Sequence, residues 1–139
     1  MRPFFLLALL ALALAAEPIR WIDDYDRAFA QARAAHKPLM LFLTRPGCKS
    51  CLFMRETVLT DHAVRAYVNA HFIAAELPIR APGLPEKYRV EVSPVFTFID
   101  PAEDEIVEQI IGGKKAAPFL KTLQGVIADN PQFRSVRRP

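Results

Sequence analysis

Residues 39–51 read LMLFLTRPGCKSC, a stretch in which a strand, a turn and the start of a helix follow one another. The five apolar residues 39–43 are typical of a central strand that is buried on both faces of a sheet. Arg45-Pro46-Gly47 supplies the turn, because proline and glycine interrupt regular structure. A helical pattern begins at Cys48. The sequence therefore predicts that this strand delivers a Cys-x-x-Cys pair to the beginning of a helix.

The spacing of Cys48-Lys49-Ser50-Cys51 has a chemical consequence. Residues i and i+3 at the start of a helix lie about one turn apart, close enough for two sulfurs to form a disulfide. The first cysteine faces backbone N–H groups and the positive end of the helix dipole, and both favour the thiolate, which is the nucleophile of disulfide exchange. Lys49 and Arg45 add positive charge nearby. We therefore expect a redox-active pair.

A Cys-x-x-Cys pair also occurs in zinc sites and in purely structural disulfides. A zinc site needs two more ligands, and the three histidines, His36, His62 and His71, show no finger-like spacing. A structural disulfide across so short a loop would constrain the unfolded chain little. The residues favour redox chemistry over both interpretations, and we expect no bound metal or other cofactor.

The chain has 139 residues, enough for one domain, of which 52% are hydrophobic and 24% charged. This balance argues against disorder, and two cysteines are too few for a disulfide-dense mini-protein. The formal net charge of +3 suggests nucleic acid at first sight. Much of the excess lies in Arg134, Arg137 and Arg138, so we expect a flexible basic tail at 131–139 and no nucleic-acid partner.

The first sixteen residues, MRPFFLLALLALALAA, are typical of a secretory signal peptide. Arg2 is the single leading cation, and the apolar run after it is shorter than the roughly 20 residues of a spanning helix. Ala13-Leu14-Ala15 fits an A-x-A cleavage site. We expect a cleavable signal at 1–16 and a mature domain over 17–130. The alternative is an uncleaved signal, the one route by which we expect contact with a membrane.

The rest of the chain alternates helical and strand patterns. Apolar spacings of three and four predict helices over 21–36, from Cys48, after Thr60 or Asp61, and over 114–129. Apolar runs predict further strands over 72–77, 95–99 and 105–111, the last two joined as a hairpin. We expect an α/β fold with a mixed central sheet of about four strands flanked by helices.

Several stretches of the chain carry a resemblance to a known family: WIDDYDRAFAQARAAHKPLMLFL, GCKSC, VSPVFTFID, and the last strand and helix around Gly112-Gly113. The chain resembles the thioredoxin superfamily over residues 20–129, and more closely its exported members. The resemblance implies a thioredoxin-like fold and thiol:disulfide oxidoreductase activity. It makes Cys48 the attacking thiol and Cys51 the resolving thiol.

The resemblance also implies roles for the residues around the cysteines. Pro94 matches the family's cis-proline, and the backbone of Ser93 would pair with an extended substrate. Together with Gly47, these are the expected substrate-binding residues. The dipeptide Lys49-Ser50 and Arg45 would tune the redox potential, and a cation there should move it towards oxidising values.

Three positions depart from the pattern of thioredoxin itself. Gly47 stands where a tryptophan is usual, Phe42 where a buried acid is expected, and Leu52 where a basic residue is usual. These departures favour a specialised partner over a general reductase. Phe53, beside the active-site helix turn, could touch substrates, but we expect it to pack partly in the core.

The implied setting is an oxidising compartment. We expect a monomeric periplasmic or secreted oxidoreductase that exchanges disulfides with protein thiols and disulfides. A reductase in such a compartment needs an electron supply, and the family suggests a membrane thiol-electron transporter. A hypothesis of a different class also stands: a thioredoxin-like module without catalysis that binds a client or delivers copper through its thiols.

Overall fold

The computed structural model describes residues 17–134, and our predictions for residues 1–16 and 135–139 lie outside the described residues. Five strands form one sheet in the order β1-β3-β2-β4-β5. β1 and β2 run parallel to β3, whereas β4 is antiparallel to both β2 and β5. The expected α/β fold with a mixed sheet is confirmed, and a short first strand adds a fifth to the roughly four expected. The bounds are Trp21–Ile22 (β1), Leu39–Thr44 (β2), Ile73–Pro78 (β3), Val95–Asp100 (β4) and Glu105–Ile111 (β5).

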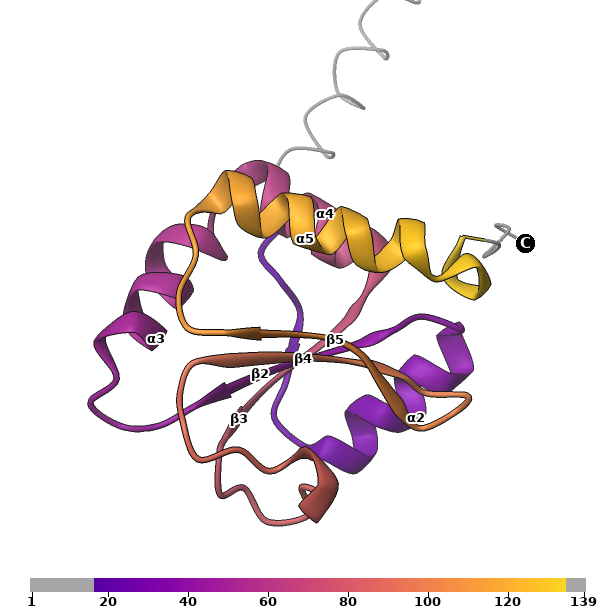
Figure 1. The fold of residues 1–139 in the computed structure, drawn as a ribbon, viewed down its shortest axis with the longest axis horizontal. Helices are drawn as coiled ribbons and strands as arrows, with labels where there is room; N and C mark the ends of the chain where they lie inside the picture. The colour runs from indigo at the N-terminus through magenta and orange to yellow at the C-terminus, as the bar shows by residue number, and fades with distance from the viewer. Residues whose placement is uncertain (1–16, 135–139) are drawn as a thin grey trace, which may run out of the picture.

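Helices cover both faces of the sheet, with α2 on one face and α4 and α5 on the other (Figure 1). The shorter α3 lies where β2 ends, and a π-helical turn, η3, continues it. The helical bounds are Tyr25–Ala35 (α2), Lys49–Phe53 (α3), Met54–Val58 (η3), His62–His71 (α4), Glu86–Tyr88 (η4), Ala116–Asp129 (α5) and Pro131–Phe133 (η5).

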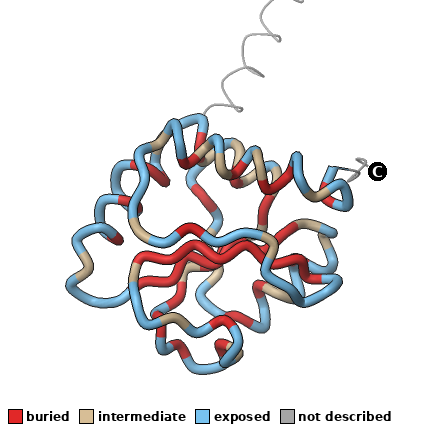
Figure 2. The backbone as a smooth tube through the Cα atoms, viewed as in Figure 1, coloured by how far each residue is buried: buried red, intermediate tan, exposed pale blue. Residues whose placement is uncertain are grey.

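All six residues of the central strand β2 are buried. Because side chains alternate between the two faces of a strand, Met40 and Phe42 join the core with α4 and α5, whereas Leu39, Leu41 and Leu43 join the core with α2. Figure 2 shows the buried residues concentrated along the middle strands. Full burial of each leucine or phenylalanine stabilises the fold by about 1.5–3 kcal/mol. The predicted burial on both faces is confirmed.

The expected helix over 21–36 is wrong at its beginning. Trp21 and Ile22 pair with β3 as a strand, and helix α2 starts only at Tyr25. Asp24 is the N-cap, and its carboxylate accepts a hydrogen bond from the Arg27 N–H at 2.8 Å. An aspartate that satisfies this otherwise unpaired donor fixes where the helix begins. Trp21 instead packs its ring on Phe42, with the centroids 5.8 Å apart.

The folded domain continues past the expected boundary at residue 130. Pro131–Phe133 form the short helix η5, and Phe133 is only 7% exposed in the core beside α5. The side-chain amide of Gln132 donates to Asp100 Oδ2 at 3.0 Å. Residues 131–133, which the sequence indicated to be tail, therefore belong to the domain, because an aromatic side chain there finds an apolar site.

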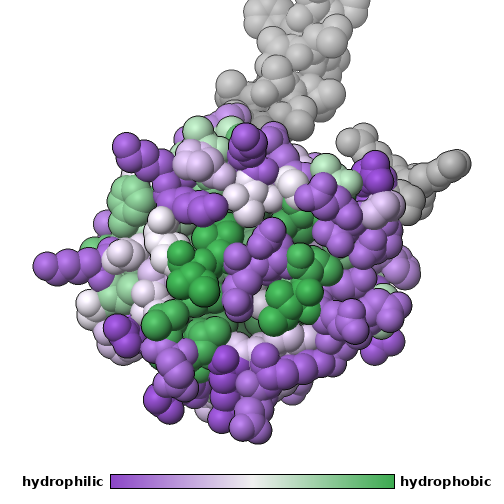
Figure 3. All heavy atoms as spheres, viewed as in Figure 1, coloured by the Kyte–Doolittle hydropathy of each residue, from purple (hydrophilic) through white to green (hydrophobic). Residues whose placement is uncertain are grey.

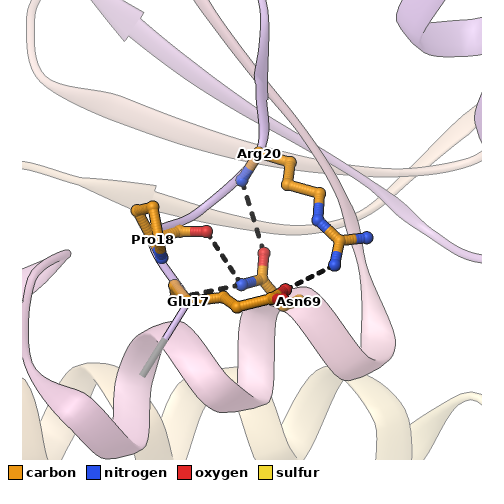
Figure 4. A network of polar contacts seen from close by, with 4 residues as sticks. All are labelled: Glu17, Pro18, Arg20 and Asn69. Atoms are coloured by element: carbon orange, nitrogen blue, oxygen red, sulfur yellow. Dashed lines mark hydrogen bonds and ion pairs between the residues drawn. The ribbon is translucent and has the colours of Figure 1, made fainter. Parts of the chain in front are cut away.

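Asn69 of α4 holds the first described residues against the domain (Figure 4). Its Nδ2 donates to the carbonyl oxygens of Glu17 and Pro18 at 3.3 and 3.0 Å, and its Oδ1 accepts from the Arg20 N–H at 3.4 Å. An ion pair between Glu17 and Arg20 joins the same network. These contacts direct the chain into β1.

None of the helices within residues 17–134 has the length and apolar character that a membrane span requires.

Candidate active site

Cys48 and Cys51 form a disulfide where β2 turns into α3. Gly47 lies in this turn with a φ of +74°, a conformation that favours glycine. Cys48 is the N-cap of α3, and its Sγ accepts a hydrogen bond from the Cys51 N–H at 3.1 Å. The two Cα atoms are 5.2 Å apart, within the usual range for a disulfide. Strand, turn and helix thus place the two cysteines as their spacing predicts.

The two cysteines differ in their exposure to solvent. Cys51 is only 2% exposed and belongs to the core, whereas Cys48 is half-buried at the edge of the same cluster. An incoming thiolate or disulfide can therefore reach Cys48 more readily than Cys51. The chemistry that this arrangement allows is exchange between an external sulfur and Cys48, with Cys51 available behind it.

The start of β4 and the end of β5 form a second edge of the site. The Ser93–Pro94 peptide bond is cis, and the Pro94 carbonyl accepts a hydrogen bond from the Gly112 N–H at 2.9 Å. A Cβ atom at Gly113 would lie 3.8 Å from Ser50 Cβ, so this edge approaches α3 closely. The Ser93 hydroxyl is buried and has no hydrogen-bond partner within residues 17–134.

A hollow of about 600 Å³ opens beside the disulfide. Three residues proposed for the site, Arg45, Gly47 and Lys49, lie in its wall together with both cysteines. Ser50, Ser93 and Pro94 do not line it. The wall is completed by Thr44, Pro46, Leu52, Arg55 and Pro78.

Arg55 is a member of this wall that was not predicted from the sequence. Its guanidinium forms an ion pair with Glu76 of β3 and lies 5.9 Å from the centroid of the Phe42 ring. Arg55 follows Cys51 by four residues, a spacing that places two helical side chains on one face and could have identified it. Glu76 is separated from Arg55 by 21 residues, and only the pairing of β3 with β2 brings it here.

The departures from the thioredoxin pattern have clear structural counterparts. Phe42 is fully buried and stacks on Phe96 with the ring centroids 4.5 Å apart, so an aromatic contact replaces the carboxylate. Leu52 is 47% exposed beside the disulfide. Phe53 is 41% exposed and is not among the residues packed in or against either core cluster, so the expectation that it packs partly in the core is wrong. It follows Cys51 by two residues on a short helix, which turns its side chain outward.

Residues 17–134 contain no group of three or more His, Cys, Asp or Glu side chains that could hold a metal ion. The chemically active groups described at this site are the two sulfurs, with cations in the neighbouring wall.

A mixed sheet flanked by helices, with a Cys-x-x-Cys disulfide at the start of a helix, defines the class of thioredoxin-like thiol:disulfide oxidoreductases. Residues 20–101 match the family described as Thioredoxin-like, and the chain belongs to this family. Its fold and its Cys48–Cys51 disulfide are those that the resemblance implied.

Relatives in sequence and in structure agree with this assignment. The chain is 33% identical over 104 residues to the thiol:disulfide interchange protein DsbD 1 of Pseudomonas aeruginosa, covering 71% of this chain but only 18% of that protein. It is 26% identical to anterior gradient protein 1 of Xenopus laevis, covering 76% of this chain and 68% of that one.

Among solved structures, a thioredoxin from Thermus thermophilus is similar with a TM-score of 0.70 and 31% identity, covering 79% of this chain and 88% of that chain. The DsbH oxidoreductase is similar in fold, with a TM-score of 0.63 at 21% identity, covering 94% of this chain and 92% of that chain.

Proposed function

We propose that this chain exchanges disulfides with protein substrates in the periplasm or outside the cell, through the Cys48/Cys51 couple. The observation that carries the choice of protein substrates is a set of exposed apolar side chains in the segments that form the site. Four of the five large hydrophobic side chains exposed within residues 17–134 lie next to site residues along the chain. Leu52 and Phe53 follow Cys51, Val92 precedes Ser93-Pro94, and Ile111 precedes Gly112.

This apolar surface is the kind that a folded or extended polypeptide covers. Ile111 is 68% exposed at the end of β5, and Figure 3 shows apolar side chains gathered over this strand on the face in view. A cluster of large apolar side chains exposed on a protein surface typically marks a site that another surface covers on binding. A small thiol would not need such an area.

The exchange proceeds in two balanced steps. The Cys48 thiolate attacks one sulfur of a substrate disulfide, the substrate S–S bond breaks, and its other sulfur leaves as a thiolate that takes up a proton. The Cys51 thiolate then attacks Cys48 Sγ, which re-forms the Cys48–Cys51 disulfide and releases the second substrate thiol. Two electrons pass from the chain to the substrate. The same steps in reverse oxidise a substrate dithiol.

The neighbouring residues support these steps. Arg45 and Lys49 place positive charge beside Cys48, which favours its thiolate and so makes the couple more oxidising. The edge formed by Ser93 and Pro94 offers backbone groups to an extended substrate segment, and Gly47 keeps the approach to Cys48 free of a side chain.

Export and an electron supply complete the proposal. The apolar run at 4–16 would direct the chain out of the cytoplasm, and the mature protein would begin at Ala16 or Glu17 and act as a monomer. When it works as a reductase, a membrane thiol-electron transporter would reduce Cys48–Cys51. A likeness to part of a thiol:disulfide interchange protein supports this setting.

The test is to trap substrates with a Cys51→Ala variant in the native host. The variant stops after the first step, so we expect disulfide-linked adducts in the exported fraction that a reductant dissolves. The matched control is Cys48→Ala/Cys51→Ala, which should form none. If Cys51→Ala forms no adducts, Cys48 alkylates slowly, and the reduced chain takes up Cu(I) tightly, the copper-delivery hypothesis replaces this one.

A further inference from the structure

Positively charged side chains flank the disulfide on two sides. Arg45 and Lys49 lie in the wall of the hollow beside Cys48. Lys114 and Lys115 follow Gly113, at the edge that approaches Ser50, and the Lys114 N–H donates to Met54 Sδ at 3.3 Å. We call Arg45, Lys49, Lys114 and Lys115 the cationic face. All four residues are exposed.

No carboxylate within residues 17–134 forms an ion pair with the cationic face. The five ion pairs in this part of the chain involve Arg20, Arg27, Arg55, Arg80 and Lys87 instead. Arg55 shows the contrast, because it lines the same hollow and is neutralised by Glu76. Lys114 donates its ammonium to the Thr122 hydroxyl at 3.3 Å, which satisfies a hydrogen bond but leaves the charge.

The hollow is suited to a charged segment of a polypeptide. Its volume of about 600 Å³ lies within the range of ligand pockets, about 300–1000 Å³. Its wall contains three cations and no acidic residue. A substrate cysteine that reaches Cys48 brings its neighbouring residues to this wall on one side, and on the other towards the segment that carries Lys114 and Lys115, which follows the approach of Gly113 to Ser50. Uncompensated charge on both sides therefore selects the opposite charge in those neighbours.

We propose that the cationic face selects substrates in which acidic residues flank the reacting cysteine. This inference rests on the proposed exchange with proteins and names the substrate class of that site. Because the four cations are exposed, they act mainly by steering the encounter. Steering of this kind raises association rates by about 10–1000-fold and falls steeply with ionic strength. Salt should therefore remove the selection without removing the exchange.

The test uses three peptides that differ only in the residues beside their disulfide, which are Glu, Gln or Lys. The first measurement is the rate at which each peptide disulfide oxidises the reduced full chain. That rate is divided by the rate at which dithiothreitol, which carries no charged side group, reduces the same peptide. This ratio removes the effect of the flanking charges on the peptide's own sulfurs. At low salt we expect the Glu peptide to react about tenfold faster than the Gln peptide. The Lys peptide should be slower than both.

Charge reversal assigns the preference to residues. Arg45→Glu/Lys49→Glu and Lys114→Glu/Lys115→Glu should each reduce or invert the Glu-to-Lys preference. The matched control, Arg33→Glu/Arg134→Glu, changes the same charge near Asp100, at the other end of β4 from Pro94, and should keep the preference. About 0.5 M salt should bring the three peptides close together, because it shortens the Debye length to a few ångströms.

Two failures are distinguishable. If the reduced chain reduces none of the peptides faster than dithiothreitol does, and no adducts form in the host, the proposed function itself fails. If all three peptides react quickly but at equal rates, or if neither salt nor charge reversal changes their order, exchange stands and selection by the cationic face is overturned.

Discussion

Gly47 joins the central strand to the disulfide-bearing helix, and its φ of +74° is one that side chains with a Cβ rarely adopt. A Cβ at this position would meet no atom within 4 Å, so Gly47→Ala creates backbone strain and no clash. We expect it to lower the free energy of unfolding by about 1–2 kcal/mol. Urea denaturation of the oxidised chain measures this.

Gly113→Ala is the matched control for Gly47→Ala. Gly113 has no positive φ, and its added Cβ would make ordinary contacts at 3.8–3.9 Å with Ser50, Met54 and Phe53. Its stability should stay close to that of the native chain. Equal losses in the two variants would contradict the explanation by backbone strain.

Residues of the site can be predicted from the sequence where the signal is local. Cys48 and Cys51 are three residues apart, and Arg45, Gly47 and Lys49 lie beside them, so spacing along one strand, turn and helix is sufficient. Glu76 was not predicted, because its contact with Arg55 depends on the register between strands. The exposure of Val92 and Ile111 was missed for the same reason, since it depends on how distant segments pack.

At the scale of elements, the turn between β4 and β5 is tied to η4 by Asp104. The Tyr88 hydroxyl donates to Asp104 Oδ1 at 2.6 Å, and Lys87 forms an ion pair with the same carboxylate. The hydrogen bond from Lys87 lowers the pKa of Asp104, while burial and the contact with Asp104 raise the pKa of Tyr88. This contact fixes the long loop after β3 onto the hairpin.

The charge of Asp104 makes the stability of the fold depend on pH. Its pKa is lower in the folded chain than in the unfolded chain, where 3.8 is the reference value, so the stabilisation is complete above that value and is lost as the pH falls through the folded pKa. Asp104→Asn keeps an acceptor for Tyr88 and tolerates the φ of +54°. We expect the variant to be less stable at pH 7 by at most about 1 kcal/mol, because the ion pair is half-exposed.

The measurement is the urea midpoint of both chains from neutral pH down to about pH 2. The difference between the native chain and Asp104→Asn should vanish in acid, where the aspartate is itself neutral. Glu103→Gln removes the same charge one residue earlier and should follow the native chain throughout. If the difference in urea midpoint between the two chains stays constant from neutral to acid pH, Asp104 acts through its shape and not through its charge.

Element boundaries were predicted well where a cap or a breaker marks them. Asp61, one of the two residues after which this helix was expected to begin, is the N-cap of α4 and accepts a hydrogen bond from the Val64 N–H at 3.1 Å. The hairpin strands β4 and β5 lie where expected. The start of α2 was wrong because Trp21 and Ile22 fit the apolar face of a helix as well as they fit a strand. Pairing with β3 decides between the two, and a single sequence does not show that pairing.

At the scale of the whole molecule, chemistry and closure of the core lie at opposite ends of the sheet. The disulfide lies at α3, and the C-terminal turn η5 lies near the other end (Figure 1). The two core clusters meet through the strands between them, with β2 contributing to both. Substitutions at the C-terminal end should therefore change stability without changing the exchange reaction.

Phe133 tests both this separation and the extent of the domain. Its ring is 7% exposed in the core, so Phe133→Ala removes a buried aromatic side chain and should lower the free energy of unfolding by about 3 kcal/mol. Arg134→Ala, one residue later and exposed, should change it by less than about 0.5 kcal/mol. Urea denaturation gives both values. The rate of peptide exchange under native conditions should equal that of the native chain in both variants.

If Phe133→Ala is as stable as Arg134→Ala, the domain ends at residue 130 as its sequence indicated. A slower exchange in a folded Phe133→Ala chain would instead show that the two ends of the sheet are coupled.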